Sequence, residues 1–188
     1  MRKTMDLKWK LSNRKVLSSN RIFTLISRDA SSPDDKIQGE FYVIETRNWV
    51  NVIPITKENK VVLVKQYRHG INDYSLEIPG GIVETEGNSA SLQAGQKELQ
   101  EETGYTSKTW EYLGKASGNP AILNNWCDFF IARDAEKTSV QNFDPHEDIE
   151  VIEVDLKELP VLLEQNKIHH PMCVAAIGWY FLKYPISG

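Results

Sequence analysis

The feature that most restricts the fold of this sequence is an amphipathic segment that follows two adjacent glycines. Gly80 and Gly81 permit a tight turn, because glycine accepts backbone conformations that other residues avoid. Beyond the turn, Asn88 or Ser89 is suited to begin a helix and Gly104 is suited to end one. The sequence therefore predicts a strand, a glycine turn and a helix of about four turns in direct succession.

Three carboxylates share one side of this helix. Glu98, Glu101 and Glu102 fall within an arc of about 100°, since successive helical residues are rotated by about 100°. Like charges four residues apart repel by about 0.2–0.5 kcal/mol, and a divalent cation such as Mg²⁺ or Mn²⁺ would remove this repulsion. The alternative is a solvated charged face on which Lys97 pairs with Glu101. The spacing by itself leaves both interpretations open.

Strand-forming segments lie on both sides of the helix. Segments rich in aromatic and β-branched residues occupy positions 21–28, 40–46, 49–55 and 61–67, and the polar residues 57–60 suggest a hairpin between the last two. Further strands are expected near 74–78, 112–115, 127–132 and 149–154, with helices at 156–165 and 171–183. Strands mixed with helices favour an α/β fold with a mixed sheet covered by helices.

Composition fits a soluble chain of one domain with a short appendage. The 188 residues are 40% hydrophobic and 26% charged, and 22 basic against 26 acidic side chains give a net charge of −4. These values exclude the disordered, collagen-like and membrane classes. We find no basic patch for a nucleic acid and no apolar segment typical of a signal peptide, so neither nucleic acid nor membrane is an expected partner.

The cysteines and two of the histidines receive structural interpretations. Cys127 and Cys173 lie far apart in apolar runs, which predicts reduced core thiols and a cytoplasmic location. Neither cysteine shows the spacing of a metal site. His169 and His170 precede a proline at a predicted helix start, and we interpret them as capping or surface residues because a zinc site would need further ligands.

The helix and its surroundings resemble a known family. Residues 97–105, KELQEETGY, closely resemble the second half of the Nudix box. Other features of the ADP-ribose pyrophosphatase-like branch of Nudix hydrolases follow in order: QYR at 66–68, EIPGG at 77–81, Pro120 downstream of Gly104, and DIEV at 148–151. The resemblance implies a Nudix α/β/α sandwich with a mixed sheet.

The implied activity is metal-dependent hydrolysis of a nucleoside diphosphate linked to another moiety. ADP-ribose, cleaved to AMP and ribose 5-phosphate, is the leading substrate, and nucleotide sugars of the GDP-mannose or UDP-glucose type are an alternative. A catalytically weakened Nudix module that binds a nucleotide is a further alternative.

The resemblance also implies roles for individual residues. The expected ligands of Mg²⁺ or Mn²⁺ are Gly80, Glu98, Glu101, Glu102 and Glu147. Glu147 is the first choice as the base for the attacking water, while Glu98, Glu101 and Asp144 remain candidates. The expected substrate contacts are Arg68, Glu77 and Pro120. The structural alternatives are that Arg68 is only an arginine at the end of a strand and that Glu77 is an exposed strand carboxylate. Trp49 is expected to lie in the packed interior or in a dimer interface, and the alternative is that it stacks on the base of the substrate.

The first half of the box departs from the family pattern. Two additional residues separate Gly81 from position 97, Asn88 stands where a glutamate is usual, and Lys97 replaces the arginine that braces the metal-binding glutamates. Lysine offers a point charge instead of a planar fork. We therefore expect a functional but weaker metal site.

The N-terminal residues 1–48 precede the expected Nudix hydrolase domain, residues 49–188. Their apolar segments 22–26 and 41–44 need a partner surface to bury one face. We expect a β subdomain that forms a homodimer and reaches the partner's substrate pocket. The alternative is that these strands fold back on their own subunit.

Overall fold

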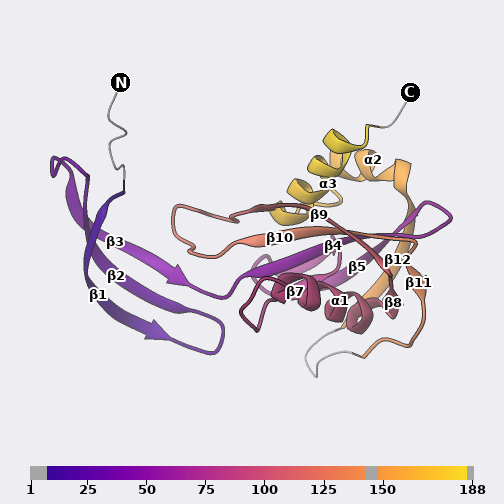
Figure 1. The fold of residues 1–188 in the computed structure, drawn as a ribbon, viewed down its shortest axis with the longest axis horizontal. Helices are drawn as coiled ribbons and strands as arrows, with labels where there is room; N and C mark the ends of the chain where they lie inside the picture. The colour runs from indigo at the N-terminus through magenta and orange to yellow at the C-terminus, as the bar shows by residue number, and fades with distance from the viewer. Residues whose placement is uncertain (1–7, 143–147, 186–188) are drawn as a thin grey trace. The chain divides into compact units, whose positions relative to one another are not determined.

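The structure, a computed structural model, describes residues 8–142 and 148–185 (Figure 1). The chain divides into two compact units. The first comprises Met1–Arg47 together with Asn119–Asn125, and the second comprises Asn48–Gly118 together with Trp126–Gly188. The return of the chain to the first unit at Asn119–Asn125 is a feature that the sequence did not predict.

The first unit contains a three-stranded antiparallel sheet in the order β1 (Lys10–Ser19), β2 (Thr24–Ser31) and β3 (Gln38–Glu45). The strands predicted at 21–28 and 40–46 correspond to β2 and β3, each shifted by up to three residues. Strand β1 was missed because its sequence, KLSNRKVLSS, is mostly polar and all of its residues are exposed. Asn20 closes the turn that follows, since its Oδ1 accepts hydrogen bonds from the N–H groups of Ile22 and Phe23.

The second unit contains a seven-stranded mixed sheet. Its main path runs β12 (Ile149–Asp155), β5 (Lys60–Arg68), β4 (Trp49–Ile55), β10 (Cys127–Arg133) and β9 (Thr109–Ala116). Strand β6 (Asp73–Glu77) pairs with β5, and β7 (Gly80–Ile82) pairs with β4. Because β4 and β10 are parallel while the other pairs are antiparallel, the predicted mixed sheet is confirmed. Two short strands, β8 (Tyr105–Thr106) and β11 (Glu136–Lys137), pair separately.

Helices cover both faces of this sheet, as Figure 1 shows. Along β4, Val52 packs in one cluster with Leu99 of α1 (Ala90–Thr103). The next residue, Ile53, packs in another cluster with Ile177 of α3 (Pro171–Lys183) and Leu159 of α2 (Leu159–Glu164). Alternate residues of a strand face opposite sides, so the expected α/β/α sandwich is confirmed.

The ends of the helices follow the sequence signals closely. Helix α1 begins after Ser89 and ends at Gly104, which has a φ of 76° and donates its N–H to the Gln100 carbonyl. The helix expected at 156–165 begins instead as a 3₁₀ turn, η1 (Leu156–Glu158), before α2. Within the part of the chain that the structure describes, no helix is long and apolar enough to cross a bilayer.

Candidate functional site

The glycine turn lies directly against the carboxylates of α1. The Gly80 N–H donates a hydrogen bond to Oε2 of Glu102 over 2.9 Å. A Cβ added at Gly81 would lie 2.4 Å from Cδ of Glu98, and one added at Gly80 would lie 2.2 Å from the Val50 carbonyl oxygen. A side chain at Gly80 would therefore collide with the β4 backbone, and one at Gly81 would displace the Glu98 carboxylate.

The three helix glutamates differ in their surroundings. Glu102 is 4% exposed and Glu98 is half-buried against the turn. The Glu101 side chain is 35% exposed and forms the ion pair with Lys97 that the sequence suggested, at 3.3 Å. The solvated charged face therefore does not account for Glu98 and Glu102, which lie against Gly80 and Gly81.

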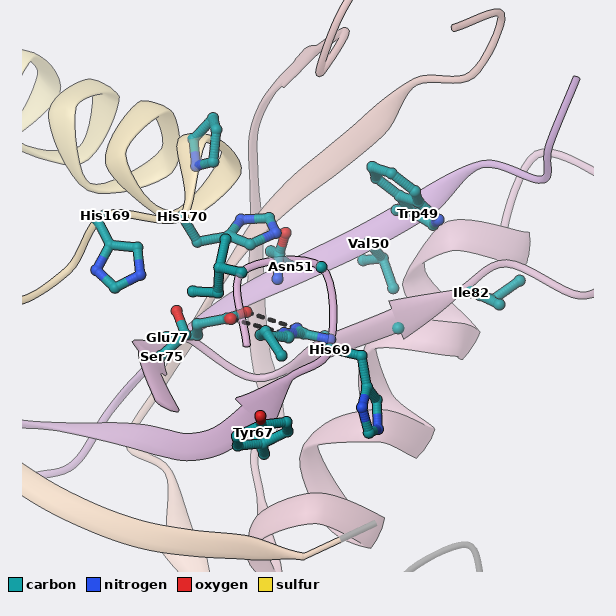
Figure 2. A pocket seen from close by; sticks show the side chains of 16 residues that line it. Trp49, Val50, Asn51, Tyr67, His69, Ser75, Glu77, Ile82, His169 and His170 are labelled. Carbon is teal, nitrogen blue, oxygen red and sulfur yellow. Dashed lines mark hydrogen bonds and ion pairs between the residues drawn. The ribbon is translucent and has the colours of Figure 1, made fainter. Parts of the chain in front are cut away.

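A cavity of about 600 Å³ lies beside the glycine turn (Figure 2). Gly80 and Gly81 form part of its wall, and Trp49 and Ile82 lie at the end opposite to the histidines that precede α3. The wall is completed by residues of β4, β5, β6, the turn between β5 and β6, and the start of α3 with the loop before it: Val50, Asn51, Tyr67, Arg68, His69, Gly70, Ile71, Ser75, Glu77, His169, His170 and Pro171.

Arg68 and Glu77 form a bidentate ion pair in this wall. Nε and Nη2 of Arg68 donate to the two carboxylate oxygens of Glu77 at 2.7 and 2.6 Å. The Glu77 side chain is 1% exposed, while that of Arg68 is 40% exposed. Burial would raise the pKa of Glu77, but the hydrogen bonds and charge of Arg68 hold that pKa below its usual value. The alternative of an exposed strand carboxylate at Glu77 is therefore wrong.

Three histidines line the same cavity, namely His69, His169 and His170. His170 caps α3 as expected, because its Nδ1 accepts a hydrogen bond from the Met172 N–H over 3.3 Å. Burial lowers the pKa of His170, which keeps its imidazole neutral near pH 7. Nothing in the sequence indicated that His169 and His170, far from the glycine turn along the chain, would reach this cavity.

The remaining predicted residues are Pro120, Glu147 and Asp144. Pro120 belongs to the first unit, where it lines a groove with Trp9 and Phe41. Its role in substrate binding stays a prediction. Glu147 and Asp144, the carboxylates expected to complete the metal site or act as the base, lie outside the described residues.

The donor atoms around the glycine turn fit one kind of cation. The side chains of Glu98, Glu101 and Glu102 offer carboxylate oxygens only, which suit hard ions such as Mg²⁺ and Mn²⁺. Glu102 keeps its carboxylate beside a backbone N–H while almost excluded from solvent. The residues present therefore fit a divalent cation bound at oxygen.

Comparison with known proteins identifies the family. The chain is 28% identical over 180 residues to the methanol dehydrogenase activator of Bacillus methanolicus, covering 93% of this chain and 96% of the relative. It is also 28% identical over 182 residues to the ADP-ribose pyrophosphatase of Bacillus subtilis (strain 168), covering 95% of each chain.

A solved structure and a family model agree with these relatives. A crystal structure of an ADP compounds hydrolase aligns with a TM-score of 0.81 at 21% identity, over 95% of this chain and 96% of that one. The NUDIX domain family matches residues 45–175, which include the glycine turn, α1 and every residue named in the cavity wall. The chain therefore belongs to the Nudix family.

Proposed function

We propose that this protein hydrolyses the diphosphate of ADP-ribose, giving AMP and ribose 5-phosphate. The observation that carries this proposal is the glycine turn, which holds Glu98 and Glu102 on one side and forms the wall of a 600 Å³ cavity on the other. Such a volume is typical of small-molecule sites. The similarity over almost the whole chain to a protein named ADP-ribose pyrophosphatase supports the substrate.

The proposed metal ligands are Gly80, Glu98, Glu101, Glu102 and Glu147, and the proposed metal is Mg²⁺ or Mn²⁺. A bound cation would supply positive charge to the phosphoryl oxygens and acidify water. In the reaction a water oxygen bonds to one phosphorus, the bridging P–O bond breaks, and the water proton passes to a carboxylate. Glu147 remains the first choice for that carboxylate, with Glu98, Glu101 and Asp144 as the other candidates.

Arg68 is the proposed contact for the diphosphate. Two of its N–H groups are engaged by Glu77, and its side chain, 40% exposed at the cavity, has further N–H groups for a phosphate oxygen. Glu77 then acts mainly by holding the guanidinium in place. This role differs from the direct substrate contact that the family resemblance implied.

The test is a hydrolysis assay on ADP-ribose, GDP-mannose and UDP-glucose with Mg²⁺ or Mn²⁺, in which nucleoside monophosphate release is measured by chromatography. We expect the highest kcat/KM with ADP-ribose and strong loss of kcat in Glu98→Gln. Glu164→Gln, which changes an exposed glutamate of α2, is the matched control and should retain activity. Faster hydrolysis of a nucleotide sugar would reassign the substrate. Binding without turnover of any compound would favour a binding module.

We also propose a homodimer formed through the N-terminal sheet. Several large apolar side chains of this sheet are exposed, including Leu11 (57%), Val16 (55%) and Phe41 (42%). Sedimentation should show a dimer at micromolar concentration, which Val16→Lys weakens and the control Ser12→Lys, on the same exposed strand, does not. A wild-type monomer with full activity would contradict the proposal. The two free, buried cysteines support the proposed cytoplasmic location, where thiols stay reduced.

A further inference from the structure

Three potential metal ligands meet behind the cavity wall. A carboxylate oxygen of Glu77, a ring nitrogen of His170 and the sulfur of Cys173 all lie within 4.8 Å of one another. Glu77 ends β6, whereas His170 caps α3 and Cys173 lies in its first turn. Glu77 and Cys173 are almost completely buried, and Glu77 and His170 also line the cavity (Figure 2).

We propose that Glu77, His170 and Cys173 form a second cation site, separate from the helix glutamates, that binds a divalent transition metal of the Zn²⁺ type.

The ligand chemistry distinguishes this cluster from the glycine turn. Zinc binds thiolate sulfur at about 2.3 Å and imidazole nitrogen or carboxylate oxygen at about 2.0–2.2 Å, so its tetrahedral ligands lie roughly 3.3–3.6 Å apart. The observed upper limit of 4.8 Å requires only a small closure of the three side chains. A thiolate favours Zn²⁺ or Co²⁺ over Mg²⁺, whereas the helix glutamates offer oxygen alone. Three protein ligands also leave a fourth position, which would face the cavity lined by Glu77 and His170.

The ion pair with Arg68 does not exclude a metal at Glu77. A carboxylate has about four lone-pair positions, and Arg68 uses one on each oxygen. Glu77 can therefore bind a cation and keep its arginine. The positive charge of Arg68 opposes the metal, but loss of the Cys173 proton on binding supplies a compensating negative charge.

The two ligands of α3 differ in protonation: the His170 imidazole is ready to bind a metal, whereas the Cys173 thiol must first lose its proton. Burial keeps the His170 imidazole neutral, and its one lone pair makes only a long contact with the Met172 N–H, which the metal would replace. Burial raises the pKa of the Cys173 thiol, with smaller effects from Glu77, Arg68 and Cys127. Binding of a metal would displace this thiol proton to solvent.

The experiment is a titration of the metal-free full-length protein with Co²⁺ at about pH 7.5, without substrate. A Co²⁺–thiolate bond gives an intense charge-transfer absorption in the near ultraviolet that oxygen ligands do not give. We expect this band to saturate at one equivalent, and to persist in a Glu98→Gln/Glu102→Gln double variant. Cys173→Ser should abolish it. Cys127→Ser, which alters the other buried cysteine, is the matched control and should retain it.

A second variant covers the case in which Cys173→Ser fails to fold. His170→Gln changes a half-buried residue at the start of α3. It should weaken Co²⁺ binding by at least about 100-fold, because loss of a residue that binds the metal directly should exceed the loss of about 10–100-fold that follows removal of a residue that only orients a ligand. Absence of the band in the wild-type protein, or a band that Cys127→Ser removes and His170→Gln leaves unchanged, would overturn the proposal. Since no hydrolysis is measured, this result is independent of the proposed ADP-ribose activity.

Discussion

Replacing Arg68 by methionine is expected to destabilise the protein, because the change leaves the buried Glu77 carboxylate without a cation. Removing one partner of a fully buried ion pair costs about 3–5 kcal/mol. The Arg68 side chain is 40% exposed, so water can reach part of the vacated space and the lower value of about 2–3 kcal/mol applies. At about 2–4 °C per kcal/mol, Tm should fall by about 4–12 °C.

The size of this loss should depend on pH in a defined direction. In the wild-type protein Arg68 holds the pKa of Glu77 below its value in the unfolded chain, so the stabilisation is present above about pH 4.3 and is lost as pH falls below it. In the Arg68→Met variant burial is no longer opposed by the arginine, and the pKa of Glu77 should rise above its unfolded value. The variant therefore loses stability as pH rises, and its deficit against wild type should be larger at pH 8 than at pH 4.5.

Urea unfolding followed by circular dichroism at these two pH values measures the deficit. The double variant Arg68→Met/Glu77→Gln should recover part of the lost stability, because it leaves no unpaired buried charge. Arg47→Met, which removes an exposed guanidinium, is the control and should change stability by less than about 0.5 kcal/mol. A deficit in Arg68→Met that is absent at pH 8, or equal at both pH values, would refute the reasoning.

Three further predictions concern α1 and the end of α3. Lys97→Arg should raise metal affinity or activity, since an arginine fork can hold two carboxylate oxygens where Lys97 forms an ion pair with Glu101 through a single ammonium group. A large loss in a Mg²⁺ titration of the rate would contradict the alignment of the box. Glu102→Gln should keep the fold by circular dichroism yet lower kcat by several orders of magnitude, and wild-type turnover at saturating Mg²⁺ would exclude this carboxylate from the metal site. Glu111 accepts hydrogen bonds from Lys183, Tyr184 and Arg133, which lower its pKa to about 2 against the opposing effect of burial. The stabilisation from ionised Glu111 is present above about pH 4.3 and disappears as pH falls towards 2. Glu111→Gln should therefore lower the free energy of unfolding by about 2 kcal/mol at pH 7 and by almost nothing near pH 2. An equal loss at both pH values would be inconsistent with a charged network.

The sequence by itself determined the parts of this protein that depend on local chemistry. Gly104 ends α1 in the left-handed conformation that glycine favours, and the helix begins after Ser89 as predicted, although the Ser89 side chain makes no capping hydrogen bond. The period of the helix places its glutamates on one side. Strand β4 and helix α3 were predicted with their observed bounds because each has a strong apolar pattern. The resemblance to the Nudix box rests on such a local segment, and the family match confirms it.

Only the tertiary structure decided which distant residues meet. Strand β1 is polar and exposed, so its pairing with β2 left no apolar pattern to detect. Glu77 looked like a strand carboxylate of undecided exposure, but the antiparallel pairing of β5 with β6 brings it to Arg68, and α3 covers it on the other side with His170 and Cys173. Strand register and helix packing are long-range interactions, and the free energy that selects them comes from burying surfaces that no short segment contains.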